Sequence, residues 1–122
     1  MEQLTQLNRV ELRGIVGAVR LTRISDTLCA KLSVVTNYAY KSKDLGCVIE
    51  TVWHTANLFP GKGISEKDLE RVQKGDKVHI VGRLRMQRYT GVDGTERTVY
   101  EVAASEFEIY GEDSCLKLEQ KD

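Results

Sequence analysis

Apolar and polar side chains alternate with a two-residue period over five long stretches of the chain. The clearest case begins at Thr27, after which every second residue is apolar, at Leu28, Ala30, Leu32 and Val34. This period is typical of a β-strand with one buried face. The pattern predicts five strands, over residues 8–24, 27–43, 47–59, 76–90 and 97–110.

The first of these stretches changes parity part of the way along. Val10 and Leu12 share one face, but after Gly14 the apolar positions move to Ile15 and Val19. A glycine at such a change is typical of a β-bulge or a sharp bend in the strand. We therefore predict a bulge or a sharp bend at Gly14.

In the third and fourth stretches the alternation places side chains on two faces without a change of parity. In the segment "TVWHTANLF", Trp53 and Phe59 fall on the polar face, and His54 falls on the apolar face with Val52, Ala56 and Leu58. In the fourth stretch the alternation predicts an inward set, which comprises Val78, Ile80, Leu84 and Met86. Two large aromatic side chains on a polar face need an explanation, because a domain without a binding partner usually buries such side chains.

A single helix is predicted between the third and fourth strands. In "GISEKDLERVQKG", Ser65 is a suitable N-cap, and Asp68 stands three residues later, at the spacing of a capping box. Ile64 and Leu69 are placed to form a hydrophobic staple across the first turn. Gly75 is expected to end the helix, which gives it about ten residues.

Three strands, one short helix and two further strands are the element order of a five-stranded OB-fold, a Greek-key β-barrel. The predicted class is therefore all-β with one helix between strands three and four. A β-sandwich is the alternative, but sandwiches usually contain about seven shorter strands. We assign residues 1–110 to this domain and expect the polar segment 111–122 to be a disordered C-terminal extension.

The composition and the charge of the chain are compatible with the predicted fold. The chain has 122 residues, 41% hydrophobic and 30% charged, and its net charge is zero. Residues 1–100 carry 16 Lys and Arg against 11 Asp and Glu, so +5, whereas residues 101–122 carry 2 against 7, so −5. A basic body with an acidic end is compatible with a phosphate-binding surface. No apolar run approaches the ~20 residues of a membrane span, so no membrane partner is expected.

Enzyme chemistry is disfavoured by the residues present. His54 and His79 are the only histidines, and they lie on different strands. The three cysteines are widely spaced and form no CxxC pair, which argues against a zinc site or a disulfide framework and suits a reducing cytoplasm. No phosphate-binding loop or nucleophile motif is present. We expect no catalytic residues, no metal and no cofactor.

Aromatic and basic residues instead suggest a nucleic-acid surface. Bases stack on aromatic faces for ~1–3 kcal/mol each, while Lys and Arg neutralise the phosphates between them. For any single tyrosine, packing at the barrel rim is the simpler interpretation, but the grouping favours a stacking platform for single strands of any sequence. The candidate residues are Tyr38, Tyr40, Lys41, Lys43, Trp53, Phe59, Lys62, Arg83, Arg85, Arg88 and Tyr89.

Over roughly residues 7–110 the chain resembles the bacterial single-stranded-DNA-binding proteins. The resemblance is carried by "LNRVELRGIVG", "LSVVTN", "ETVWHTANLF", "VQKGDKVHIVGRLR" and "RTVYEV". It implies an OB-fold and a homo-oligomer, usually a tetramer built from dimers. It matches Trp53 and Phe59 to stacking aromatics of the family, places Tyr40 and Tyr89 where tryptophan is often found, and puts His54 near the subunit contacts.

Two departures from the family qualify the resemblance. Pro60 interrupts the connection after Phe59, where the family more often continues into Gly-Lys. The family also usually ends in a long Gly/Pro/Gln-rich linker and an acidic tip that finishes in apolar residues, whereas this sequence ends in "SCLKLEQKD". The resemblance therefore does not extend to tail-mediated recruitment of replication enzymes, and it fits a tail-less paralogue or a plasmid or phage version.

The sequence leaves two functions open. The leading one is sequence-tolerant binding of single-stranded DNA in replication, recombination or repair, in the bacterial cytoplasm. The alternative is a protein-interaction OB module, such as an adaptor of a primosome-like complex, for which DNA affinity is secondary. The zero net charge and the tyrosines at tryptophan positions keep the alternative open.

Overall fold

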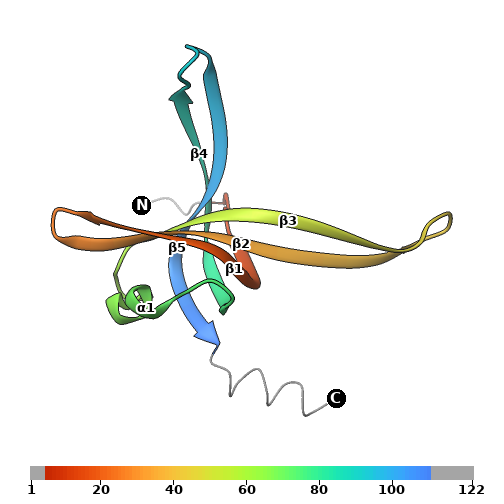
Figure 1. The fold of residues 1–122 in the computed structure, drawn as a ribbon, viewed down its shortest axis with the longest axis horizontal. Coiled ribbons are helices and arrows are strands. Elements are labelled where there is room, and N and C mark those ends of the chain that lie inside the picture. The colour runs from red at the N-terminus through yellow and green to blue at the C-terminus, as the bar shows by residue number, and fades with distance from the viewer. Residues whose placement is uncertain (1–4, 111–122) are drawn as a thin grey trace.

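The five predicted strands and the single helix are all present, and the strands close into a barrel (Figure 1). A computed structural model describes residues 5–110 of the chain. The elements are β1 (Val10–Ile24), β2 (Thr27–Ser42), β3 (Gly46–Leu58), α1 (Glu66–Arg71), β4 (Lys77–Thr90) and β5 (Glu96–Tyr110). The strand order around the barrel is β1-β2-β3-β5-β4, and the predicted OB-fold is confirmed.

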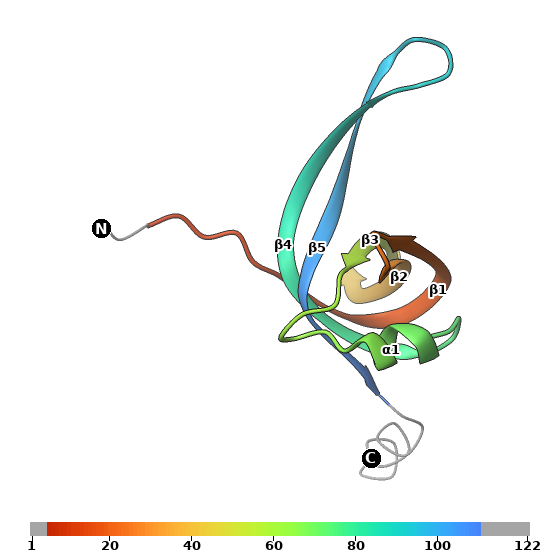
Figure 2. The same ribbon diagram turned by 90° about the vertical axis from the view of Figure 1, so that its left-hand side faces the viewer.

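Hydrogen bonding around the ring is almost entirely antiparallel. The exception is the closure between β3 and β5, which are parallel and pair only at Ala56 with Val102 and at Asn57 with Ala103. The interior is filled by aliphatic side chains and by Phe107, which together come from all five strands and from α1, the helix beside the barrel (Figure 2). Its most deeply buried members are Leu32, Leu58, Leu69, Ile80, Val16, Val34 and Val78.

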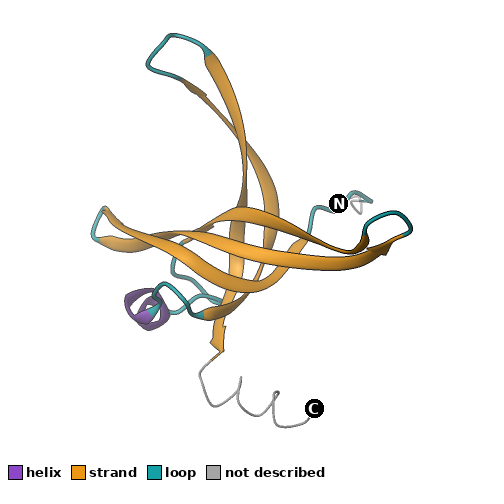
Figure 3. Cartoon of the chain, turned by 45° about the vertical axis from the view of Figure 1, so that its right-hand side comes forward, coloured by secondary structure: helices purple, strands orange, loops and turns teal. Residues whose placement is uncertain are grey.

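Two long hairpins extend away from this core. The β2–β3 hairpin and the β4–β5 hairpin project in different directions as two-stranded arms (Figures 1 and 3). Val52, Leu84 and Met86 were predicted to face the core, but they lie on these arms and are 47%, 45% and 49% exposed. The alternation continues along each arm, yet beyond the barrel no second layer formed by residues 5–110 covers the apolar side. The predicted inward positions of these three residues are therefore wrong.

The bulge in β1 lies three residues later than predicted. The pairing of β1 with β2 shifts between Val16 and Ala18, so the extra residue is Gly17 and not Gly14. Val16 is buried and Ile15 is exposed, which reverses the predicted face of Ile15. Gly14 has a different role, because a Cβ there would lie 2.3 Å from the carbonyl oxygen of Val35 on the neighbouring strand. Close strand approach, and not a bulge, requires that glycine.

The helix begins as predicted and ends early. The side chain of Ser65 accepts a hydrogen bond from the backbone N–H of Lys67, and the Ile64 and Leu69 side chains are both buried, as expected for a staple. The Asp68 side chain does not complete a capping box, because its Oδ1 accepts a 3.1 Å hydrogen bond from Arg71 Nε. The helix spans six residues and ends where Val72 becomes extended, so the predicted length and the end at Gly75 are wrong.

The remaining domain predictions concern the chain ends. The predicted C-terminal segment 111–122 lies outside the described residues. Within residues 5–110, no helix is long and apolar enough to cross a membrane.

Candidate nucleic-acid interface

Trp53 lies on the outer face of the barrel, as its parity predicted. It pairs with Val35 across β2 and β3, and its side chain is 60% exposed. The buried part of the indole lies over the bulge of β1, because a Cβ on Gly17 would stand only 2.4 Å from Cζ3 of the ring. The missing side chain of Gly17 therefore makes room for the indole, which rests on backbone and leaves much of its surface free for a second planar group.

Phe59 follows the end of β3 and is half-exposed. It borders a groove on the outside of β1, β2 and β3, where Arg20, Lys31 and Asn57 also contribute to the lining. An aromatic ring beside two cations and an amide can hold a base and its phosphate together. The groove thus extends the surface that starts at Trp53.

Strand pairing brings side chains of one outward parity, most of them polar, into a line across all five strands. Arg20 of β1 pairs with Lys31 of β2, Lys31 pairs with Asn57 of β3, Asn57 pairs with Ala103 of β5, and Ala103 pairs with Arg83 of β4. We call this set, with Arg85 and its partner Glu101, the cationic band: Arg20, Lys31, Asn57, Arg83, Arg85 and Glu101. The predicted Arg83 and Arg85 therefore share the outward parity of Trp53 and Phe59.

Four members of the cationic band were not predicted. Arg20, Lys31 and Asn57 each have the outward parity of their own strand, which was visible in the alternation. Their grouping depends on pairing between strands that are distant in the sequence, and nothing in a single strand reports that pairing.

Glu101 is the other unpredicted residue, and it is the one buried charged side chain among residues 5–110. Its Oε2 lies 3.0 Å from Lys31 Nζ, and its Oε1 accepts a 2.8 Å hydrogen bond from Asn57 Nδ2. Burial raises the pKa of the Glu101 carboxyl, but the hydrogen bonds from Asn57 and Lys31 and the charges of Lys31 and Arg85 together lower it below its usual value. The cationic band therefore contains an ionised carboxylate.

The predicted tyrosines of β2 lie on the arm and not on the face of Trp53. Tyr38 and Tyr40 pair with Glu50 and Val48, so their parity is opposite to that of Trp53. Both rings are exposed, and their centroids are 6.1 Å apart at a tilted angle. Two aromatic surfaces thus occur on the β2–β3 hairpin, one on each side.

The other predicted residues are also exposed but are scattered. Lys41 alternates onto the side of Trp53, and Lys43 lies in the turn of the β2–β3 arm. Tyr89 and Arg88 lie near the tip of the β4–β5 arm on opposite faces, with Tyr89 on the side of Arg83 and Arg85. Lys62 is exposed in the loop between β3 and α1. The predicted platform is therefore divided between the barrel, two arms and a loop.

His54 faces the core side of β3 near the barrel rim. Its Nε2 lies 2.8 Å from Thr36 Oγ1, and partial burial lowers the pKa of the imidazole. The ring is therefore neutral at neutral pH. The hydrogen bond agrees with a structural role, and contact with another subunit stays a prediction.

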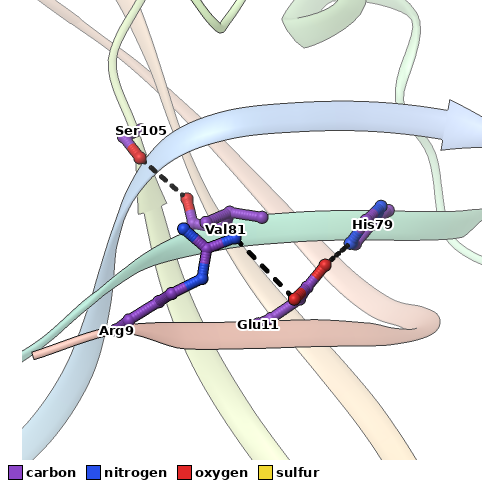
Figure 4. A network of polar contacts seen from close by, with 5 residues as sticks. All are labelled: Arg9, Glu11, His79, Val81 and Ser105. Atoms are coloured by element: carbon purple, nitrogen blue, oxygen red, sulfur yellow. Dashed lines mark hydrogen bonds and ion pairs between the residues drawn. The ribbon is translucent and has the colours of Figure 1, made fainter.

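A second polar cluster lies on β1 and β4 (Figure 4). His79 Nε2 lies 2.6 Å from Glu11 Oε2, and Arg9 Nη2 lies 3.8 Å from Glu11 Oε1. The hydrogen bond from His79 lowers the pKa of the Glu11 carboxyl. The His79 ring also stacks on Tyr110, at 6.2 Å between centroids. In the same view the Ser105 hydroxyl donates a 3.2 Å hydrogen bond to the carbonyl oxygen of Val81 (Figure 4). Within residues 5–110 no three His, Cys, Asp or Glu side chains could hold a metal ion.

Known structures share this architecture. The chain superposes on the SSB of Plasmodium falciparum, solved in complex with ssDNA, with a TM-score of 0.73 and 17% identity over 88% of this chain and 97% of that one. It superposes on a deletion mutant of the single-stranded DNA binding protein from Thermus aquaticus with a TM-score of 0.72 and 19% identity, over 87% of this chain and 51% of that one. These likenesses establish the fold.

Sequence comparison identifies the family. The single-stranded DNA-binding protein of Neisseria meningitidis is 31% identical over 108 residues, which cover 86% of this chain. The chain spans only 60% of the length of that curated relative. The family model described as "Single-strand binding protein family" matches residues 7–110. The chain therefore belongs to the single-strand binding protein family.

Proposed function

We propose that this chain binds single-stranded DNA without strong sequence preference and without catalysis, and that it acts in DNA replication, recombination or repair. One observation carries the proposal: all five aromatic side chains that the sequence nominated for stacking are at least 40% exposed, on the barrel wall and the two arms. They are Tyr38, Tyr40, Trp53, Phe59 and Tyr89. Family membership and the ssDNA in the complex of the Plasmodium relative support it.

The geometry accounts for binding that tolerates sequence. Every base has a π-face, so Trp53 and Phe59 can stack on any base that the strand presents. The arginines of the cationic band and the basic residues of the arms contact phosphates, which are the same at every nucleotide. Because the aromatic residues are spread over separate elements, a strand must wrap around the domain to engage them all. A stiff duplex cannot follow such a path, which favours single strands.

The direct test is a titration of the protein with oligo-dT, followed by the fluorescence of Trp53, the only tryptophan. We expect strong quenching as the indole leaves water and stacks on a base. A duplex of the same length serves as the control and should quench weakly. Absence of binding to oligo-dT would refute the proposal and favour a protein-interaction adaptor of a primosome-like complex.

We also propose that the chain forms a homo-oligomer, most simply a tetramer. The support is the apolar side of the β4–β5 arm, where Leu84, Met86 and Tyr100 are exposed next to Leu7. His54 at the barrel rim is a candidate interface residue. Light scattering should report a multiple of the 13.8 kDa chain mass. A monomer at micromolar concentration would contradict the assembly.

The domain assignment and the location follow from the same proposal. Residues up to 110 would form the DNA-binding domain, and its DNA substrate would place the protein in the bacterial cytoplasm. A truncated chain that ends at residue 110 should bind oligo-dT with the affinity of the full chain.

A further inference from the structure

A negative side chain at the centre of a surface for an anionic polymer needs a physical reason. Glu101 is buried in the cationic band, between Lys31 on one side and Arg85 on the other. A carboxylate at that place repels phosphate and so opposes binding.

We propose that Glu101 limits the affinity of the chain for single strands by holding the Lys31 ammonium, so that phosphates engage one cation fewer than the surface displays. The inference rests on the proposed function and adds a tuning residue to it. Glu101 touches no DNA in this account and acts through Lys31.

The geometry of the Lys31–Glu101 ion pair explains why a DNA phosphate does not replace Glu101 as the partner of Lys31. The ammonium and the carboxylate are 3.0 Å apart, and the Glu101 side chain is only 9% exposed. Moving the ammonium onto a phosphate would leave a buried carboxylate without its ion partner, which is costly. Lys31, which is about half exposed, therefore stays with Glu101 when a strand binds.

Asn57 makes the arrangement rigid. An ionised carboxylate only accepts hydrogen bonds, so the Asn57 amide must turn its nitrogen toward Glu101 and its oxygen away. Two donors from two strands thus fix the carboxylate at the junction of β3 and β5. A glutamine at position 101 can accept from one of these donors and keeps the volume, so the substitution removes the charge with little change in packing.

The test compares Glu101→Gln with Glu108→Gln by oligo-dT titrations over a series of salt concentrations. Glu108 lies on the same strand and is exposed outside the cationic band, so its variant makes the same change in net charge. For Glu101→Gln we expect binding about fivefold tighter at low salt, the factor for one unit-charge contact in water. Its salt slope should be steeper by about 0.7, the value for one additional phosphate neutralised.

A second comparison tests whether Glu101 acts through Lys31. If it does, adding Glu101→Gln to the Lys31→Met variant should leave the salt slope of oligo-dT binding unchanged. Circular dichroism and thermal melting establish that each variant is folded. The comparison of Glu101→Gln with Glu108→Gln decides the matter even if Lys31→Met fails to fold.

The outcomes separate this inference from the proposed function. An unchanged salt slope in Glu101→Gln, weaker binding, or an effect equal to that of Glu108→Gln would overturn the inference while the wild-type chain still binds oligo-dT. A wild-type chain that ignores oligo-dT would overturn both. A steeper slope confined to Glu101→Gln and abolished by Lys31→Met would establish it.

Discussion

Replacing Trp53 with alanine should weaken DNA binding far more than it weakens the fold. Trp53 is 60% exposed, so about 40% of its surface is buried, and its ring lies against the bulge at Gly17. A fully buried tryptophan removes roughly 200 Å² from water, so the buried part amounts to roughly 80 Å². At about 25 cal/mol per Å², the substitution should lower the free energy of unfolding by at most about 2 kcal/mol. A core tryptophan would cost ~3–5 kcal/mol.

The loss of DNA affinity comes from the exposed part of the ring. If a base stacks on it, Trp53→Ala should cost about 1–3 kcal/mol of binding free energy, or roughly a 5- to 150-fold rise in Kd. Trp53→Phe, which keeps a smaller ring, should fall between the wild type and the alanine variant.

The assay must not depend on tryptophan emission, because Trp53→Ala has none. Anisotropy of a labelled oligo-dT measures binding, and urea titration followed by circular dichroism measures stability. Normal oligo-dT affinity in a folded Trp53→Ala variant would refute the stacking role. A loss of ~3–5 kcal/mol of stability with unchanged affinity per folded molecule would show that the indole is a core residue.

Three further predictions test other parts of the surface. Gly17→Ala should reduce oligo-dT affinity in a folded protein, since the added Cβ would displace the Trp53 ring, whereas Gly61→Ala, with no atom within 4 Å of its Cβ, should bind normally. Arg85→Ala should make the salt slope of oligo-dT binding shallower by about 0.7, and an unchanged slope would remove this residue from the DNA surface. Burial lowers the pKa of His54 in the folded state, so the unfolded state binds the proton more tightly; stability should fall as pH drops below about 6.5. Urea unfolding at pH 7.5 and 5.5 should show a smaller fall for His54→Gln than for the wild type.

The chain's local patterns determined the elements and the fold class. Two-residue alternation located all five strands to within a few residues, and the Ser65 cap with the Ile64–Leu69 staple located the start of the helix. These signals are local, because each depends on neighbours along the chain. The outward positions of Trp53 and Phe59 were predictable for the same reason.

The two-residue alternation predicted burial wrongly at positions where burial depends on whether another part of the fold covers that side of the strand. Val52, Leu84 and Met86 continue the apolar parity of their strands, yet they project past the point where the barrel closes. Parity says which residues share a side, but only the packing of other strands makes that side a core. The bulge at Gly17 was misplaced for a related reason, since a bulge is defined by the pairing with β2.

Which side chains stand together on the candidate DNA surface was decided by the tertiary structure alone. Lys31, Asn57 and Glu101 come from three strands, and 44 residues separate the last two in sequence. They meet because β3 and β5 pair in parallel at Asn57 and Ala103, a closure that no local pattern encodes. Strand register also placed Tyr38 and Tyr40 on the opposite parity to Trp53. The sequence thus determined which side chains share a side of each strand, whereas barrel closure determined which sides are buried and which side chains stand together, because long-range register depends on the whole fold.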